Sequence, residues 1–391
     1  MTKATASAGR FAYLDGLRGI AATLVLFEHI FEVMIHDIRW TAIDSGVLAA
    51  TFGDTINIGR FGVILFFLIS GFVIPFSLNE NSTIKSFLIS RFFRLYPLYW
   101  LSILFCLLCM TLSQLPIPRI TNVIFNITMV QQFFGESNLI GVYWTLTVEL
   151  VFYGMCVILF YLRLLHSPWL LSTIIIAIMA GGCALYLWDG ALADRLPIAA
   201  LVNISFMFFG TLLRLALIER SASAQFLAWI AGAAVIISTP IILFLIHTNV
   251  ATEPSLLTFR NDLTGTAAAL TVFALGLWRK PAFGGGMIWL GSISYGLYLF
   301  QSPIVDALRF LIDGSAATFA FYVVATVLTS FAVSGLVHSL FENPINKWGR
   351  EMAKKARRES NPIRISIAAS ATCVADQRAR VADSLQNPVN Q

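Results

Sequence analysis

The sequence predicts an all-α membrane protein, a polytopic bundle of about ten transmembrane helices, and composition is the first reason. Hydrophobic residues make up 58% of the 391 positions and charged residues 12%, whereas a soluble domain is about 45–50% apolar and about 25% charged. The chain also holds 32 phenylalanines, and its mean hydropathy is +0.78. So few charged side chains cannot cover a water-facing surface. This excludes a soluble enzyme, a disordered chain and a nucleic-acid-binding protein.

The second reason is the spacing of apolar segments along the chain. A helix needs about 20 mostly apolar residues to cross a hydrocarbon core of about 30 Å. Pro97 is expected to open the third such helix, because its missing N–H group is not needed at a helix start. The first segment is not expected to be a cleaved signal peptide, because charged residues interrupt it and no small-residue cleavage site follows. The ten candidate segments are 12–35, 59–78, 97–114, 140–161, 169–188, 197–217, 226–246, 263–278, 288–311 and 318–340.

Charged residues outside these segments predict the domain organisation and the orientation. Ten crossings place both termini on the same side of the membrane, and 20 of the 26 Lys and Arg residues fall on that side, which predicts cytoplasmic termini. Residues 1–345 form the predicted membrane domain. Residues 346–391 are predicted to be a basic, disordered cytoplasmic tail, in which the run 354–358 contacts anionic lipid. The five cysteines form no metal-ligand cluster, so no metal site is predicted.

The first apolar segment carries ionisable residues, which are costly in lipid and usually face the interior of a bundle. Arg18 and His29 are eleven residues apart. At about 100° and about 1.5 Å per residue they lie about 20° apart on one helix face and about 16 Å apart along the axis. Glu32 follows at i+3 and is close enough to orient His29.

An arginine binds phosphate in a bidentate way, and a histidine takes and returns a proton near neutral pH. The alignment of Arg18 with His29 therefore indicates an extended donor molecule, with an anionic head on the arginine and a reactive end at the histidine. The structural alternative is an arginine that snorkels to the membrane surface and a buried, hydrogen-bonded histidine.

Two further clusters have a chemical and a structural interpretation. The spacing of Arg91 and Arg94 fits a basic clamp at the cytoplasmic surface, but positive-inside topology beside an aromatic belt explains it at least as well. Glu149 lies in the fourth apolar segment and needs a partner, for which an Arg or His of another helix is expected. The sequence is equally consistent with a structural ion pair and with a chemical role for Glu149. His338 and Glu342 lie one turn apart and are expected to pair.

Six sequence motifs occur in the same order as in one family of membrane enzymes, and together they are specific. They are YLDGLRGIAA at 13–22 leading to His29, GVILFFLISGF at 62–72, RFFR at 91–94 followed by Tyr96 and Pro97, WTL at 144–146 with Glu149, SYGLYL at 294–299 and FENP at 341–344. With these motifs, residues 11–345 resemble the acyltransferase-3 family of bacterial membrane acyltransferases in its stand-alone form. Its members include O-acetyltransferases of lipopolysaccharide, exopolysaccharide and Nod factor.

The resemblance implies a membrane O-acyltransferase that moves an acyl group, usually acetyl from cytoplasmic acetyl-CoA, to a hydroxyl of an extracytoplasmic carbohydrate. It implies a bacterial inner-membrane location, acyl-CoA as a co-substrate rather than a bound cofactor, and an envelope or exported glycan as the acceptor. Whether His29 acts as a base on the acceptor or briefly carries the acyl group stays open. The candidate site residues are His29, Glu32 and Glu149 for catalysis and Arg18, Arg91 and Arg94 for acyl-donor binding.

Two features depart from the family pattern. Gln301 stands where many relatives have His, and a Gln side chain forms hydrogen bonds but cannot shuttle a proton. The 46 residues after Ile345 are too few for the extracytoplasmic hydrolase-like domain that some relatives carry. The alternatives are a transporter or flippase with a charged central path and no covalent chemistry, and a catalytically silent relative.

Overall fold

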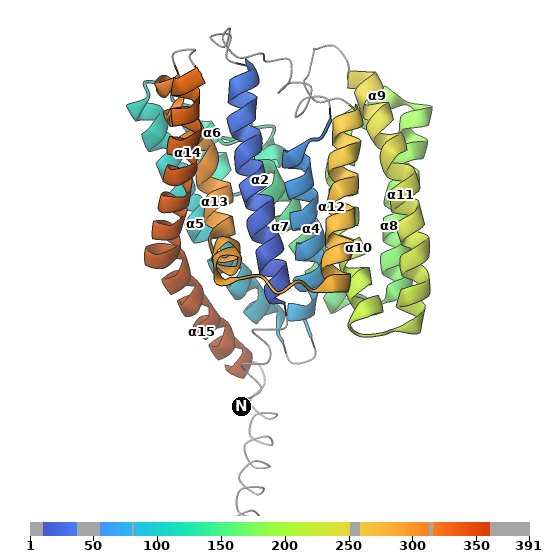
Figure 1. Ribbon diagram of the computed structural model, residues 1–391. Coiled ribbons are helices and arrows are strands. Elements are labelled where there is room, and N and C mark those ends of the chain that lie inside the picture. The colour runs from blue at the N-terminus through green and yellow to red at the C-terminus, as the bar shows by residue number, and fades with distance from the viewer. Residues whose placement is uncertain (1–10, 37–54, 80–81, 251–258, 313–315, 360–391) are drawn as a thin grey trace, which may run out of the picture.

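The computed structural model describes residues 11–36, 55–79, 82–250, 259–312 and 316–359, and over these ranges the chain is helical with no β-strand. The helices are α2 (Ala12–His36), α4 (Ile58–Val73), α5 (Ile84–Leu112), α6 (Ile120–Ile127), α7 (Tyr143–Tyr161), α8 (Pro168–Trp188), α9 (Gly190–Arg195), α10 (Ile198–Leu217), α11 (Ala222–Val250), α12 (Phe259–Arg279), α13 (Gly285–Ala307), α14 (Ala316–Val337) and α15 (Asn343–Glu359). They form one bundle with α2 between α13 and α4, α5 and α14 at one side, and α8 and α11 at the other (Figure 1).

The predicted fold class, an all-α polytopic membrane protein, is confirmed by these helices. Each of the ten segments predicted from hydropathy overlaps one of the long helices. Seven stretches within the described ranges are long and apolar enough to cross a membrane: Ile58–Ser77, Ile84–Leu112, Tyr143–Tyr161, Pro168–Trp188, Ile198–Leu217, Ala222–Thr248 and Ala317–Glu359. The number of ten crossings stays a prediction.

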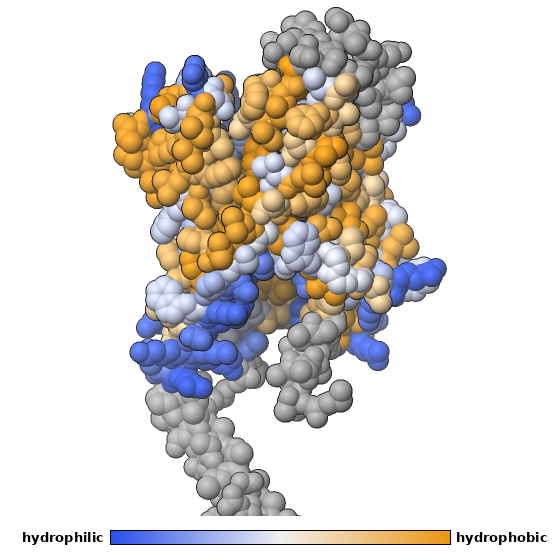
Figure 2. Space-filling view, turned by 60° about the vertical axis from the view of Figure 1, so that its left-hand side comes forward, coloured by the Kyte–Doolittle hydropathy of each residue, from blue (hydrophilic) through white to orange (hydrophobic). Residues whose placement is uncertain are grey.

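Large apolar side chains cover the outer faces of the bundle. Trp188 is 84% exposed and Trp229 is 82% exposed, and many leucines and isoleucines around them are exposed as well. Figure 2 shows apolar residues over most of one face and hydrophilic residues gathered at its lower end. A soluble monomer rarely exposes so much continuous apolar surface, so these faces are the ones that contact lipid. The hydrophilic end, where α2 begins and α15 lies, is called the basic end below.

Helix α5 begins earlier than the sequence predicted. The Thr83 side chain accepts a hydrogen bond from the backbone N–H of Ser86, and the Ser86 hydroxyl accepts one from the backbone N–H of Thr83. This capping box satisfies N–H groups that the first turn of a helix leaves without partners. Pro97 therefore lies inside α5 and does not open it, which corrects the prediction. The same helix carries Arg91 and Arg94 toward the basic end.

Close packing of the central helices depends on two glycines. A Cβ atom at Gly291 would overlap the backbone carbonyl of Asp15, so α13 lies directly against the start of α2. A Cβ atom at Gly71 would overlap the carbonyl of Met207, so α10 lies equally close to α4. A larger residue at either position would push the helices apart. The first of these contacts fixes one wall of the cavity described below.

Residues 346–359 are helical, whereas the composition predicted a disordered tail from residue 346. They belong to α15, which packs on α5: a Cβ atom at Gly349 would overlap the Phe93 side chain, and the rings of Trp348 and Phe93 are 4.9 Å apart. Ala356, about two turns further along, is also buried. The prediction is wrong for this stretch because its basic residues leave one helix face, with Gly349 and Ala356, to pack on α5. Residues 360–391 of the predicted tail lie outside the described residues.

Candidate active site

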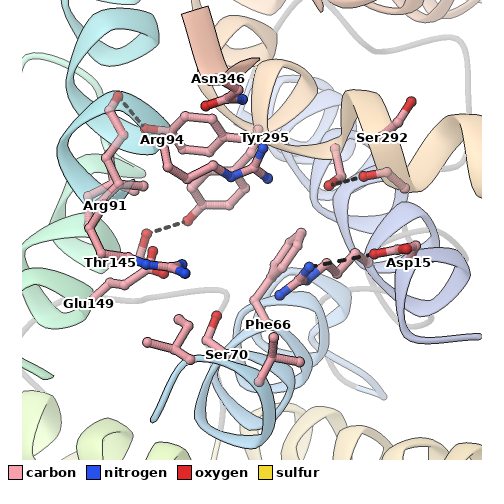
Figure 3. Close-up of a pocket in the computed structure, with 18 of the residues that line it drawn as sticks. Asp15, Phe66, Ser70, Arg91, Arg94, Thr145, Glu149, Ser292, Tyr295 and Asn346 are labelled. Carbon is pink, nitrogen blue, oxygen red and sulfur yellow. Dashed lines mark hydrogen bonds and ion pairs between the residues drawn. The ribbon is translucent and has the colours of Figure 1, made fainter. Parts of the chain in front are cut away.

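A cavity of about 420 Å³ lies within the bundle near the basic end (Figure 3). Its walls come from α2, α4, α5, α7, α13, α15 and the turn between α14 and α15. The charged and imidazole side chains that line it are Asp15, Arg18, Arg91, Arg94, Glu149, His338 and Arg350. Four arginines face two carboxylates among these lining residues, so the cavity favours anions.

Arg18 lies near the start of α2 and reaches the cavity beside Asp15. The Arg18 Nη1 atom is 3.6 Å from Oδ1 of Asp15, one turn earlier in the helix, and the Arg18 side chain is 23% exposed. Arg94 and Glu149 also lie within electrostatic range of Arg18. In Figure 3, Asp15 lies on one side of the space, with Arg91 and Glu149 across from it. This single long ion pair leaves most of the Arg18 guanidinium to bind a ligand.

Helix α5 carries Arg91 and Arg94 into the same cavity. The Arg91 guanidinium carbon is 5.5 Å from the centre of the Phe87 ring and 5.8 Å from that of the Tyr153 ring, while its buried Nε has no hydrogen-bond partner in the described part of the chain. Nη1 of Arg94 donates a hydrogen bond of 2.8 Å to Oε1 of Glu342. Arg91 is therefore positioned by rings and keeps donors for a ligand, whereas Arg94 is already bonded to a carboxylate.

Glu149 reaches the cavity from α7. Its Oε1 accepts a hydrogen bond of 2.6 Å from the Tyr153 hydroxyl on the same helix. The sequence predicted an Arg or His partner on another helix, and the structure corrects this: the bonded partner is a tyrosine, and Arg18 acts on Glu149 only at longer range. The cavity therefore holds a carboxylate close to three arginines without a direct ion pair to any of them within the described ranges.

The predicted pairing of His338 with Glu342 is confirmed. The His338 Nδ1 atom is 2.8 Å from Oε2 of Glu342. Both residues belong to η5 (His338–Glu342), a π-helical turn between α14 and α15. Such turns are rare and are frequent at functional sites. The sequence did not reveal that His338 lines the cavity or that Arg94 binds the other oxygen of the same carboxylate, because both facts depend on the packing of α5 against this turn.

His29 and Glu32 lie outside this cavity, although they are on the same helix as Arg18. Nδ1 of His29 is 3.3 Å from Oε2 of Glu32. The other ring nitrogen of His29, Nε2, is buried and has no hydrogen-bond partner among the described residues. Phe66 lines the cavity and also packs on the apolar cluster that contains Ile30 of α2. Apolar side chains thus pack against α2 at Ala22 and Leu26, which lie between Arg18 and His29 in the helix. Arg18 lines this cavity and His29 does not, and a donor molecule that extends from one to the other stays a prediction.

Helix α13 supplies the polar surroundings of His29. Asp306 lies within electrostatic range of both His29 and Glu32, and it lines a second cavity of about 120 Å³. Gln301 is fully buried, and neither of its amide atoms has a hydrogen-bond partner in the ranges that the structure describes. The sequence reasoning missed Asp306, although an aspartate inside an apolar segment was the kind of signal that pointed to Glu149.

The fold and the site together define a class: a polytopic membrane protein with an arginine-rich cavity at one end of its bundle. A family profile described as an acyltransferase domain matches residues 11–335. The chain belongs to the acyltransferase-3 family, which confirms the resemblance found in its motifs. The predicted enzyme class, an acyltransferase, is confirmed at the level of this domain.

Two characterised proteins are similar to parts of the chain. Nodulation protein 10 of Rhizobium leguminosarum bv. viciae is 30% identical over 168 residues, which cover 38% of this chain and 43% of that protein. Acyltransferase MdmB of Streptomyces mycarofaciens is 28% identical over 152 residues, which cover 37% of this chain and 38% of that protein. The chain thus matches less than half the length of either relative. No solved structure matches the chain significantly.

Proposed function

We propose that the protein transfers an acyl group, most simply acetyl, from acyl-CoA in the arginine-rich cavity to a hydroxyl of an extracytoplasmic carbohydrate. The observation that carries this proposal is the convergence of Arg18, Arg91, Arg94 and Arg350 from three helices on one cavity. Arginine stays charged and binds phosphate oxygens in a bidentate way. Coenzyme A carries phosphates at one end and the acyl thioester at the other, so it suits a cavity that is lined both by arginines and by apolar residues such as Val63, Phe66 and Phe67.

In this proposal the basic end faces the cytoplasm of a bacterium, and the bundle lies in its inner membrane. Acyl-CoA then enters from the compartment that contains it, as a co-substrate and not as a bound cofactor. The excess of Lys and Arg in segments at this end supports the orientation. Glu149, bonded to Tyr153 among the arginines, acts at the donor and not beside His29.

His29 serves the acceptor half of the proposed reaction. As a base it takes the proton of the sugar hydroxyl, and as a nucleophile it carries the acyl group for one step. Its buried Nε2, which has no hydrogen-bond partner in the part of the chain that the structure describes, suits either role. Glu32 orients the ring through Nδ1. Phe66 and Tyr298 both line the cavity with their ring centroids 5.7 Å apart, and in this proposal the acyl arm lies against these rings.

The O-acetyl groups on surface glycans test this proposal directly. Glycans are isolated from cells that produce the wild-type chain, the His29→Ala variant or no chain, and their O-acetyl signals are compared by NMR. The proposal expects signals with the wild type alone, with the variant present in the membrane at wild-type amounts. Equal signals in all three strains would overturn the carbohydrate acceptor. If the purified chain did not bind acetyl-CoA, the proposal that acyl-CoA is the donor would be overturned, and a transporter would be favoured.

A further inference from the structure

Gln301 of α13 is a polar residue that the fold buries without a hydrogen bond. Its side chain is fully buried, and neither Nε2 nor Oε1 of its amide has a partner among the residues that the structure describes. Most buried polar atoms in proteins have one, because a buried polar group without a partner is costly. A methionine has about the same length and would fill this position without that cost. The amide thus has a donor and an acceptor to offer to a ligand.

Gln301 lies on the face of α13 that packs on α2. It is four residues after Leu297 and four before Val305, and both belong to the apolar cluster that also contains Leu26 and Ile30 of α2. Residues four apart share one face of a helix. The amide is therefore placed on the side of α13 that meets α2.

His29 is at the same level of the bundle as Gln301. Arg18 and Gly291 line the donor cavity near the starts of α2 and α13, so both helices leave it in the same direction. At this point the helices are in close contact, since a Cβ atom at Gly19 would lie 2.9 Å from the backbone N of Gly291. His29 and Gln301 each follow ten residues later, about 15 Å beyond that contact.

His29 also belongs to the edge of the contact between the two helices. It is three residues after Leu26 and four before Val33, and both are members of the same apolar cluster. Its buried Nε2 likewise has no hydrogen-bond partner within the described ranges. The axes of packed helices are about 8–10 Å apart, a gap that two facing side chains fill. One small ligand group at this level therefore contacts both the ring and the amide.

This level adjoins the inner wall of the donor cavity. Tyr298, which lines the cavity, is three residues before Gln301, and Phe66, which also lines it, packs on the apolar cluster. In the proposed function the acyl arm lies against these two rings. The thioester is then the part of the donor next to Gln301 and His29.

We propose that the Gln301 amide donates a hydrogen bond from Nε2 to the acyl oxygen and stabilises the negative charge that forms there when the acyl carbon is attacked. Side-chain amides serve in this way in the oxyanion holes of acyl-transfer enzymes. The structural alternative is a buried water that bonds the amide in the free protein. The inference rests on the proposed function, and it holds whether His29 is a base or a nucleophile.

Both routes place charge on the same oxygen. If His29 is the base, its Nε2 takes the proton of the acceptor hydroxyl while the hydroxyl oxygen forms a bond to the acyl carbon. The C=O electron pair moves to the acyl oxygen beside Gln301. It returns as the C–S bond breaks with its electron pair on sulfur, and the thiolate takes a proton from water while His29 gives its own to water. If His29 is the nucleophile, Nε2 attacks first, and the acceptor oxygen then breaks the C–N bond through a second such intermediate. Gln301 neither gains nor loses a proton.

The test uses the full-length chain reconstituted in lipid vesicles, with acetyl-CoA as the donor and membrane glycan from the source strain as the acceptor. Free CoA thiol and transferred acetyl are both measured, and Tm is measured in detergent. Gln301→Met removes the amide and keeps the length of the side chain. Gln131→Met is the matched control, because Gln131 is also fully buried but donates to Oδ1 of Asn138, away from the lining of the donor cavity.

Gln301→Met is expected to lower kcat at least about 100-fold, as the loss of one oxyanion donor does, with unchanged KM for acetyl-CoA and for the glycan. Its Tm should equal or exceed that of the wild type, because an apolar group replaces a buried amide without partners. Gln131→Met should do the opposite: its Tm should fall, and its kcat should match the wild type.

A Gln301→Met variant with wild-type kcat would overturn the inference. A raised KM for the glycan at unchanged kcat would also overturn it, since the amide would then bind the acceptor. A fall in Tm as large as that of Gln131→Met would show that the amide is bonded in the free protein, with the same consequence. If Gln301→Met does not fold, the kcat of Gln301→Leu decides. A wild-type chain that releases no thiol and transfers no acetyl would instead contradict the proposed function, so the two failures are distinguishable.

Discussion

Two of the histidine–carboxylate pairs among the described residues lie at different depths of the bundle, and they are held very differently. At the basic end, His338 and Glu342 are 2.8 Å apart, and the carboxylate is 2% exposed. Deeper along α2, His29 and Glu32 are 3.3 Å apart, and the carboxylate is 58% exposed. A buried, doubly paired carboxylate holds its ring before any ligand arrives, as preorganised catalytic groups do. The pair at the basic end is thus held in place by the protein itself, whereas the deeper pair is held by a longer contact to an exposed carboxylate.

Removal of His29 should have the largest effect and should separate the two ends most clearly. His29→Ala is expected to lower acetyl transfer by about 10²- to 10⁴-fold, the usual contribution of a proton-transfer group. Its affinity for acetyl-CoA should not change, because His29 lies outside the donor cavity. Transfer is followed with labelled acetyl-CoA and affinity by calorimetry. A parallel loss of affinity would show that the two ends are one site.

Removal of Arg18 should instead lower the affinity for acetyl-CoA. Arg18→Ala is expected to weaken acetyl-CoA binding about 10- to 100-fold, because a charge-assisted hydrogen bond contributes about 1.5–3 kcal/mol. Arg18→Lys should restore only part of the affinity, since lysine lacks the planar fork of donors. Arg279→Ala is the control: this arginine at the end of α12 lies over the Trp278 ring at 4.3 Å, outside the cavity lining. If Arg279→Ala weakened acetyl-CoA binding equally, the effect of Arg18 would be a general electrostatic attraction and not a specific contact.

A change in helix spacing should disturb the donor end more than the deeper one. Gly291→Ala places a Cβ atom on the Asp15 carbonyl and is expected to cost about 1–3 kcal/mol of stability, as overpacking does. Acetyl-CoA affinity should fall as well, because this contact forms a wall of the cavity. Gly286→Ala is the control, since its Cβ would meet no atom within 4 Å. Thermal unfolding in detergent measures both, and identical melting curves would contradict the close approach of α13 to α2.

Asp306→Asn should give the smallest effect. Asp306 acts on His29 and Glu32 electrostatically, so a several-fold loss of kcat with unchanged acetyl-CoA affinity is expected. The same assays as for His29→Ala measure it. A loss as large as that of His29→Ala would mean that the deeper pair is held as firmly as the one at the basic end.

The fold could be predicted from sequence because the composition of each apolar segment alone indicates that it lies in lipid. In lipid, a helix is the simplest way to hydrogen-bond the backbone N–H and C=O groups of the segment. The cavity could not, because Arg18, Arg91 and Glu149 come from three helices whose packing is a tertiary property. Helix geometry correctly placed Arg18 and His29 on one helix. It could not foresee that Phe66 from α4 fills the space beside that helix.

Helix α15 shows a signal that composition hides. Its basic residues suggested a solvated tail, but Gly349 and Ala356 are seven residues apart, which is the repeat of a helix face in contact with another helix. A test for periodicity would have found this face. The start of α5 is likewise set by its capping box. Thr83 and Ser86 are visible in the sequence and would have predicted this start, but the prediction relied on Pro97 instead.

The turn after α14 lies beyond the residues that match the family profile, although it belongs to the cavity wall. The family profile stops at residue 335, yet His338, Asn343, Asn346 and Arg350 contribute to the cavity wall. A chain trimmed to the matched region would keep most of its lipid-facing helices and would lose part of the cavity wall. The cavity therefore extends past the boundary of sequence similarity, into a helix that runs along the surface of the bundle.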